Sequence, residues 1–445
     1  MPSTRGKSFW EGLIEQYGAE VLSRQISEMT PEQAEALLWD WATWARPEQL
    51  WPPGAWRVWM CLAGRGWGKT RTGAEACRHA IDQGYRRLAL VAPTAADARD
   101  VMVEGESGIL AIFPYKQRPT FNPSNRRISF SNGAIATLYS ADQPERLRGP
   151  QHDFAWCDEP ASWRRPEAWD MLMLGLRLGE DPRAVVTGTP KPLKLIRDLA
   201  KAKTTHLTTG TTFDNQSNLA PAFFADIIRK YEGTRLGRQE LNAEILGDTP
   251  GALWNWEMIE ASRCEQPPEL VRIVVAIDPA TTFGEDSDET GIIAAGLGVD
   301  GRAYVLEDGT ERAAPLEWCR SSIRLYHKLR ADRIIGETNN GGDLIEVLLR
   351  QVDPLISYQG VTASRNKITR AEPIAALYEQ GRVKHVGAFP EMEEQMCNYV
   401  PSPGVKSPDR MDALVWALTA LMIDQGPVSD TWTLPDEEIV SISPY

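Results

Sequence analysis

Long apolar runs are missing from this 445-residue sequence, and its amino terminus, MPSTRGKSFWEGL, lacks the apolar core of a signal peptide. These absences predict a chain that is neither secreted nor inserted in a membrane. Cysteine and histidine are also scarce, with six and five residues. The cysteines include no C-x-x-C pair and the histidines have no metal-ligand spacing. This argues against zinc sites and disulfides and favours a reducing compartment such as the cytoplasm.

Positive charge is in deficit, since the net charge is −13. An acidic total argues against a nucleic-acid partner. Local clusters matter more than the total, however, because charges more than about 10 Å apart are screened. Basic clusters occur at 126–127, 164–165, 191–203 and 365–370. Each is either a solvated face or a DNA contact, and the last is the best candidate for DNA. The 42% hydrophobic and 24% charged residues are typical of a globular protein, and the length predicts two or three domains.

A phosphate-binding loop is the most specific motif. Residues 57–62 are a predicted apolar strand, A-G-R-G-W-G-K-T follows, and a helix is predicted at 72–83. Ala63 replaces the first glycine of the usual pattern, but the remaining glycines still let backbone N–H groups face phosphates. Lys69 would reach the β- and γ-phosphates of ATP, and Thr70 would bind Mg²⁺. The loop residues expected to contact ATP are Gly64, Arg65, Gly66, Trp67, Gly68, Lys69 and Thr70.

The stretch ahead of this loop is rich in tryptophan. Residues 8–45 are predicted to be helical, with Thr30 as an N-cap. Eight of the sixteen tryptophans precede residue 68. They either pack against a core or, together with Arg46, Pro47 and Gln49, line an adenine pocket. The sequence leaves both interpretations open.

A short apolar run ending in two acids, F-A-W-C-D-E at 154–159, predicts a buried strand that delivers carboxylates to the nucleotide site. Asp158 would hold Mg²⁺, and Glu159 would activate the attacking water. Many strands end in an acid pair for structural reasons alone. The upstream phosphate loop favours the functional interpretation.

Further buried strands are predicted at 87–93 and at 184–190, the latter ending in T-G-T-P. Residues 128–138 predict a hairpin that turns at Asn132-Gly133. Strands that alternate with helices in this way predict a parallel, doubly wound α/β sheet.

Pro, Gly and Trp interrupt the pattern at 247–268, which predicts a domain boundary. Beyond it, three meandering strands, a helix and a fourth strand predict a ribonuclease-H-like fold. Their ranges are 271–277, 290–298, 302–307, 315–330 and 333–336. The first strand leads into Asp278 and the fourth into Glu337, so these two carboxylates should be neighbours.

A last helix, predicted at 407–421 with Ser407 as N-cap, adds Asp409 and Asp412 on one face. Carboxylates that converge in this way repel each other unless a cation neutralises them. They suit two Mg²⁺ or Mn²⁺ ions that clamp a phosphodiester. Asp286 and Asp288 are either additional ligands or ordinary turn residues. The alternative is a degenerate ribonuclease-H-like domain that is used only for binding and has no nuclease activity.

Taken together, the motifs resemble the large terminase subunits of tailed bacteriophages and of the related gene transfer agents. The resemblance spans about 46–424 and rests on six stretches: A-G-R-G-W-G-K-T-R-T-G-A-E, E-R-L-R-G-P, C-D-E-P, T-G-T-P, G-E-T-N-N-G-G-D and P-D-R-M-D-A-L. It implies a P-loop ATPase domain of the ASCE type followed by a ribonuclease-H-like, RuvC-like nuclease. The expected division is a helical segment at 1–45, the ATPase at 46–250, the nuclease at 265–425 and a loose tail at 426–445.

The resemblance also implies residue roles. Thr187, Gly188 and Thr189 match the motif that couples hydrolysis to movement. Arg148 matches an arginine finger acting on a neighbouring subunit, with Arg65 as the competing candidate. The DNA-backbone contacts would come from Arg365, Lys367 and Arg370, just ahead of a helix.

Double-stranded DNA, a small terminase subunit, a procapsid portal and a homo-oligomeric ring are the implied partners, with no membrane. The implied setting is the cytoplasm of an infected or gene-transfer-agent-producing bacterium. Two alternatives are a helicase-like ATPase fused to a resolvase-like nuclease in DNA repair, and a nucleic-acid-binding scaffold with an inactive nuclease.

Overall fold

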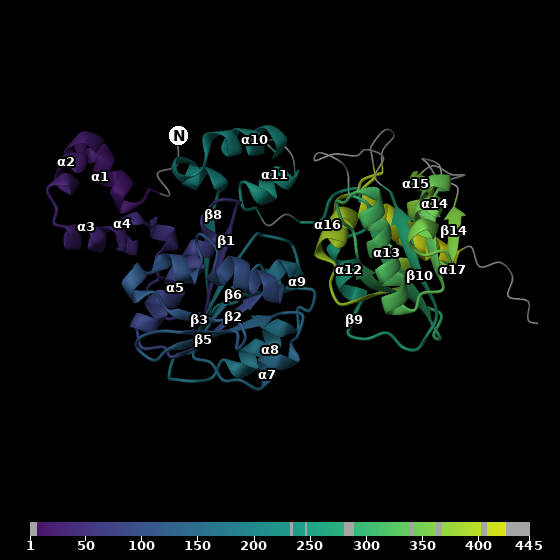
Figure 1. The fold of residues 1–445 in the computed structure, drawn as a ribbon, viewed down its shortest axis with the longest axis horizontal. Helices are drawn as coiled ribbons and strands as arrows, with labels where there is room; N and C mark the ends of the chain where they lie inside the picture. The colour runs from purple at the N-terminus through teal and green to yellow at the C-terminus, as the bar shows by residue number, and fades with distance from the viewer. Residues whose placement is uncertain are drawn as a thin grey trace, which may run out of the picture. The chain divides into compact units, whose positions relative to one another are not determined.

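The computed structural model describes residues 7–231, 235–244, 247–279, 289–338, 342–361, 367–401 and 407–423. The chain forms two compact units (Figure 1). One comprises Met1–Glu265 with Gly387–Val400, and the other comprises Gln266–Val386 with Pro401–Tyr445. The sequence predicts an unbroken second domain at 265–425, whereas the segment 387–400 groups with the first unit. The predicted tail at 426–445 lies outside the described residues.

Short helices precede the first sheet: α1 Phe9–Tyr17, α2 Ala19–Ser27, α3 Pro31–Leu38 and α4 Trp41–Trp44. Thr30 caps α3 by accepting a hydrogen bond from the backbone N–H of Gln33, whose side chain in turn accepts one from the Thr30 backbone. This reciprocal pair satisfies two N–H groups that the first turn leaves open. The predicted N-cap is therefore confirmed.

The sheet of the first unit has the strand order β3-β4-β5-β2-β6-β7-β1-β8. Its strands are β1 Val58–Ala63, β2 Arg87–Ala92, β3 Thr120–Asn122, β4 Arg127–Ser129, β5 Ile135–Ser140, β6 Phe154–Asp158, β7 Arg183–Gly188 and β8 Thr205–Gly210. All strand pairs from β5 to β8 are parallel. Every residue of β1 and β6 is buried, as expected of central strands covered on both faces. The predicted parallel α/β sheet is confirmed.

Helices connect these strands: α5 Lys69–Asp82, α6 Ala95–Asp97, α7 Glu145–Arg148, α8 Ala168–Gly175 and α9 Lys194–Lys201, followed by α10 Pro221–Tyr231, α11 Arg235–Glu240 and α12 Trp256–Ala261. The antiparallel pair β4–β5 confirms the predicted hairpin. Gly133 lies at its turn with φ 84°, a conformation that favours glycine. The strand β7 lies between β1 and β6 and therefore brings its carboxyl end between the phosphate loop and the acid pair.

In the second unit the strands follow the order β14-β13-β10-β11-β12-β15. Their bounds are β10 Leu270–Asp278, β11 Gly291–Gly298, β12 Ala303–Asp308, β13 Arg333–Glu337, β14 Tyr358–Val361 and β15 Val383–Val386. Strands β10, β11 and β12 form an antiparallel meander, and β13 pairs in parallel with β10. This is the predicted strand order. The helices of this unit are α13 Pro315–Leu329, α14 Gly342–Val352, α15 Lys367–Glu379 and α17 Asp409–Met422.

The start of α17 lies directly against the sheet at Gly291. A Cβ atom on this glycine would lie 2.2 Å from the Asp409 carbonyl oxygen. Glycine is therefore required there for the helix to reach β11, and this close approach places the acidic first turn of α17 near the end of β10.

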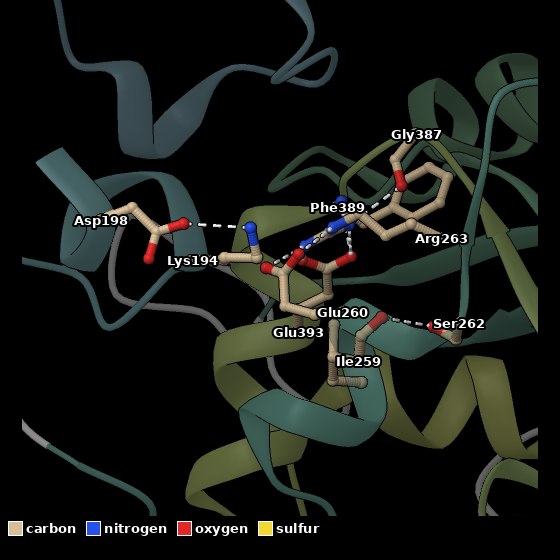
Figure 2. A network of polar contacts seen from close by, with 9 residues as sticks. All are labelled: Lys194, Asp198, Ile259, Glu260, Ser262, Arg263, Gly387, Phe389 and Glu393. Atoms are coloured by element: carbon tan, nitrogen blue, oxygen red, sulfur yellow. Dashed lines mark hydrogen bonds and ion pairs between the residues drawn. The ribbon is translucent and has the colours of Figure 1, made fainter.

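The helix α16, Pro390–Asn398, is the part of the late sequence that joins the first unit. Glu393 is fully buried and makes a bidentate ion pair with Arg263, with both N–O distances at 2.8 Å (Figure 2). Arg263 also donates to the carbonyl of Gly387 at 3.0 Å and lies 3.2 Å from Glu260. Burial lowers the pKa of Arg263, but Glu393 and Glu260 more than offset that effect and the net pKa is raised.

We expect Glu393→Ala to destabilise the first unit strongly, because it would leave the Arg263 guanidinium buried without its main counter-charge. The free energy of unfolding should fall by about 3–5 kcal/mol, measured by equilibrium urea denaturation. The matched control is Glu260→Ala, which removes the more exposed partner of the same arginine and should cost about 1 kcal/mol or less. Equal losses in the two variants would contradict the importance of the bidentate pair.

Candidate active sites

The phosphate loop connects β1 to α5. Gly66 and Gly68 have φ values of 77° and 99°, so the loop turns twice through conformations that other residues adopt only with strain. Lys69 is the first residue of α5. Its ammonium lies 3.0 Å from the carbonyl oxygen of Ala63 and 3.2 Å from the Thr189 hydroxyl. The predicted loop geometry is therefore present, and its lysine faces the end of β7.

Side chains from outside the loop hold three consecutive loop carbonyls. The carbonyl of Arg65 accepts from the Thr212 hydroxyl at 2.7 Å, and that of Gly66 accepts from the Asn215 amide at 2.6 Å. The carbonyl of Trp67 accepts from the Arg46 guanidinium. Because the carbonyl and the next N–H of a planar trans peptide point in opposite directions, turning these carbonyls outward turns the N–H groups of Gly66 and Gly68 inward, whereas the N–H of Trp67 donates to the Gly64 carbonyl at 3.3 Å. The loop is thus preorganised to bind an anion.

Thr212 and Asn215 were not predicted as site residues. Both belong to a 3-10 segment, Thr212–Asn218, that follows β8 and lies about 150 residues from the loop in sequence. Polar residues just after a strand that ends in T-T-G are the one signal that points to this carboxyl edge. Their partners depend on tertiary structure, which the sequence does not give.

Arg46 and Gln49, which the sequence offers as candidates for an adenine pocket, are buried beside the loop. The Arg46 guanidinium stacks 5.0 Å from the centroid of Trp67, and the Gln49 amide donates to the Thr72 hydroxyl at 3.1 Å. Trp56, Trp59 and Trp67 are buried in the core of this unit. Core packing therefore accounts for these three tryptophans, and an adenine contact by Gln49 stays a prediction.

The acid pair lies at the carboxyl end of β6, as predicted. Asp158 is the last residue of the strand, and Glu159 follows with φ 45° and ψ 54°. This left-handed conformation costs energy in a non-glycine residue and re-aims the Glu159 side chain. The Glu159 carboxylate lies 3.6 Å from the Lys69 ammonium and accepts the backbone N–H of Thr189 at 3.0 Å.

Asp158 sits in an environment that disfavours its charge. Burial first, and then the neighbouring Glu159 carboxylate, raise the pKa of Asp158 to about 7, while the Thr187 hydroxyl and the Lys69 ammonium act in the opposite direction. A divalent cation would supply positive charge to this pair of acids beyond that of Lys69. Carboxylate and hydroxyl oxygens are the donors Mg²⁺ prefers, so Asp158 with Thr70 suits that ion.

The predicted coupling residues contact the acid pair. Thr187 donates to the Asp158 carboxylate at 2.6 Å, and Thr189 contacts Glu159 through its backbone N–H. Gly188 lies between them at the end of β7. The two arginine-finger candidates, Arg65 and Arg148, have exposed side chains, in contrast to the buried Thr187 and Thr189. Arg148 is the last residue of the single-turn helix α7.

In the second unit, Asp278 ends β10 and Glu337 ends the adjacent parallel strand β13, as predicted. Both carboxylates are buried. Glu337 accepts the indole N–H of Trp416 at 3.1 Å, and the Arg370 guanidinium lies 3.8 Å from the same carboxylate oxygen.

Asp412 is buried on α17 and accepts a hydrogen bond from Ser407. The prediction that Ser407 caps this helix is wrong, because the N-cap is Pro408 and the serine hydroxyl is taken by Asp412. Asp409 is the first residue of the helix and is half-buried. Asp286 and Asp288 lie outside the described residues.

Arg370 is not where the sequence predicted. It lies inside α15 instead of ahead of a helix, and its guanidinium stacks 4.2 Å from the Trp416 ring centroid. Its side chain is only 10% exposed. A buried carboxylate such as Glu337 requires a nearby cation, which explains this inward position. Arg365 lies outside the described residues, as does the side chain of Lys367.

The carboxylates of the second unit fit hard divalent cations by their chemistry. Within the described ranges, however, no three His, Cys, Asp or Glu side chains lie close enough together to hold a metal ion. The protein's own donors, Ser407, Trp416 and Arg370, engage Asp412 and Glu337 instead. Within those same ranges no helix has the length and apolarity of a membrane span.

A P-loop ATPase unit and a ribonuclease-H-like unit with strand-end carboxylates define the class of two-domain ATPase–nucleases. The family profile for the N-terminal part of T4-like-virus-type large terminase subunits matches residues 60–261, and the profile for the terminase RNase-H-like domain matches 275–421. The chain belongs to the large terminase subunit family, whose phage members are DNA-packaging motors. This supports the packaging interpretation over the DNA-repair alternative.

Solved structures similar to this chain include a large terminase from a thermophilic bacteriophage in complex with ADP, at 14% identity and TM-score 0.42, covering 87% of this chain and 98% of that one. The HK97 bacteriophage large terminase is 14% identical at TM-score 0.36, covering 88% and 95%. The large terminase nuclease of the thermophilic phage G20c is 14% identical at TM-score 0.28, covering 36% and 97%. At such scores the family assignment rests on the two profiles. Comparison with curated protein sequences gives no match.

The outward-turned carbonyls generate a prediction for nucleotide affinity. Asn215→Ala removes the donor to the Gly66 carbonyl, so the loop should lose part of its preorganisation. We expect ATP to bind about fivefold more weakly, the equivalent of one ordinary hydrogen bond, in a titration with a fluorescent ATP analogue. Asn218→Ala is the matched control, because it removes an amide that donates to the Asn215 side chain at 3.0 Å and leaves the Asn215 amide to donate to Gly66. Unchanged affinity in Asn215→Ala would show that the loop holds its shape without this bond.

Proposed function

We propose that the first unit hydrolyses ATP to drive double-stranded DNA into a procapsid, and that the second unit is a divalent-metal-dependent endonuclease that cuts concatemeric DNA. The observation that carries the proposal is the convergence of Lys69, Asp158 and Glu159 at one sheet edge, in a chain of the terminase family. The outward-turned carbonyls of the phosphate loop support a nucleotide as its ligand, because the N–H groups that follow Arg65 and Trp67 then point the opposite way and can face phosphates.

In the ATPase unit, Lys69 and the inward-facing N–H groups of the loop bind the phosphates. Thr70 and Asp158 would hold Mg²⁺, which when bound neutralises charge between the β- and γ-phosphates. Glu159 orients the attacking water and accepts its proton. The contact between Thr189 and Glu159 supports a role for the 187–189 stretch in linking hydrolysis to movement.

Arg148 is proposed to reach the nucleotide of a neighbouring subunit. Its exposed position at the end of α7 supports a role between subunits, whereas Arg65, within the loop, would act in its own subunit. The ring that this requires would form with a portal and a small terminase subunit, in the cytoplasm of the bacterium that makes the particles.

In the nuclease unit, Asp278, Glu337 and Asp412 would hold Mg²⁺ or Mn²⁺, with Asp409 as an additional candidate. The metal, when bound, would activate water and stabilise the leaving oxygen of the phosphodiester. The inward position of Arg370 supports a role at this site instead of a peripheral DNA contact. Arg365 and Lys367 remain candidates for the DNA backbone.

The assignment of the general base is tested by Glu159→Ala. Its kcat for ATP should fall by about 10²–10⁴, the usual contribution of general acid–base catalysis, while ATP affinity is retained. Lys69→Ala serves as the contrasting variant, because it should weaken ATP binding itself. Steady-state hydrolysis and nucleotide titration separate the two effects. Near-wild-type turnover by Glu159→Ala would exclude it as the base.

For the nuclease, Asp278→Ala should abolish DNA cleavage and leave ATP hydrolysis intact, because the two sites belong to separate units. EDTA should stop cleavage by the wild-type protein, and Mn²⁺ should restore it. Asp300→Ala, which removes an exposed carboxylate of the same unit, is the control and should cleave normally. Cleavage by Asp278→Ala in the presence of EDTA would refute the metal mechanism.

A further inference from the structure

A buried tryptophan joins the three elements that build the ATP site. Trp156 lies in the middle of β6 and is fully buried. Its indole N–H donates to the Thr187 hydroxyl at 2.8 Å, and that hydroxyl lies 2.6 Å from the Asp158 carboxylate. An indole N–H is only a donor, so the direction of this first bond is fixed.

The sheet geometry explains why these groups meet. Trp156 and Asp158 are two residues apart on one strand and therefore point to the same face. Thr187 is the register partner of Asp158 on β7. A hydroxyl has one proton, and accepting from the indole directs that proton away from Trp156. The acceptors within reach of the hydroxyl are the Asp158 carboxylate at 2.6 Å and the Cys157 carbonyl at 3.5 Å. The hydroxyl therefore donates its hydrogen bond to the carboxylate.

The other side of the indole contacts the helix of the phosphate loop. A Cβ atom on Gly73, in α5, would lie 2.1 Å from the Trp156 ring. The ring therefore requires glycine at this position and packs on the α5 backbone. One side chain thus touches α5 and hydrogen-bonds to β7 while belonging to β6.

We propose that Trp156 is a positioning residue for ATP hydrolysis, whose indole N–H holds the Thr187 hydroxyl in the orientation that donates to Asp158. Through this contact the carboxylate that would hold Mg²⁺ keeps one fixed rotamer relative to α5 and β7. The inference rests on the proposed ATPase function. It concerns the chemical step, because nucleotide affinity comes mainly from the phosphate loop.

The test compares Trp156→Phe with the wild-type full chain in steady-state ATP hydrolysis. Phenylalanine keeps most of the packing but has no donor. We expect kcat to fall about five- to tenfold, the kinetic equivalent of one hydrogen bond, with KM for ATP changed by less than about twofold. A kcat within about twofold of wild type, or a loss confined to KM, would overturn the proposal. Absence of hydrolysis by the wild-type protein would instead refute the proposed function.

The chain provides a matched control. Trp59, on β1, is equally buried and donates to the Thr208 hydroxyl at 2.9 Å, but that threonine does not contact the acid pair. Trp59→Phe should therefore retain wild-type kcat. Thermal unfolding of both variants measures the shared packing loss. An equal fall of kcat in both variants would show that the effect is general packing.

Thr187 supplies a second route that does not depend on the folding of Trp156→Phe. Thr187→Val keeps the shape but lacks the hydroxyl and should lose kcat, whereas Thr187→Ser should retain it. The double variant Trp156→Phe/Thr187→Val should be no slower than Thr187→Val alone, because both changes break one chain of contacts. In NMR, the indole N–H signal of Trp156 is assigned as the one that disappears in Trp156→Phe. In the absence of nucleotide, this N–H should exchange with solvent faster in Thr187→Val than in the wild-type protein. Additive kinetic losses, or unchanged exchange, would overturn the proposal.

Discussion

Two adjacent carboxylates at the buried end of one strand are the constraint on which the ATP site depends. Asp158 and Glu159 repel each other, and burial adds a desolvation penalty that raises the pKa of Asp158 to about 7. The Lys69 ammonium lies 3.6 Å from Glu159 and provides the nearest positive charge. A nucleotide would draw that lysine toward its phosphates, and a bound Mg²⁺ would then have to replace the lost neutralisation. Phosphate and metal binding would therefore be electrostatically linked.

The second unit meets the same problem with different residues. Glu337 has Arg370 at 3.8 Å, where the ATP site has a lysine beside Glu159. An arginine stacked on Trp416 is held by packing as well as by charge, so its position is more strongly fixed than that of a flexible lysine. For Asp278, Glu337 and Asp412 to share a metal ion, this arginine has to give up part of its contact with Glu337. Metal binding would therefore displace a packed arginine in the nuclease unit and a flexible lysine in the ATPase unit.

Sequence patterns predicted the elements and the residues at strand ends, because apolar runs and their terminal acids are local features. Asp158, Asp278 and Glu337 all lie where the strand pattern placed them. Features that depend on distant partners were missed. Asn215 supports the phosphate loop from about 150 residues away, and α16 joins the first unit through a buried ion pair. Ser407 is a similar case. Its local sequence pattern is that of an N-cap, but its hydroxyl donates to the Asp412 carboxylate instead.

Neutral donors and cations have separate roles at these carboxylates. Thr187 donates a hydrogen bond to Asp158, and Ser407 donates one to Asp412. Each hydroxyl orients its acid without cancelling the negative charge. Lys69 and Arg370 contribute the charge instead, beside the neighbouring acids Glu159 and Glu337. A divalent ion that displaces one of these cations has no need to displace a hydroxyl as well, because the cation and the hydroxyl contact different carboxylates and a carboxylate oxygen can accept more than one contact. The hydroxyl contacts can therefore persist through metal binding and fix the carboxylate rotamers, while the lysine and the arginine would be the parts that move.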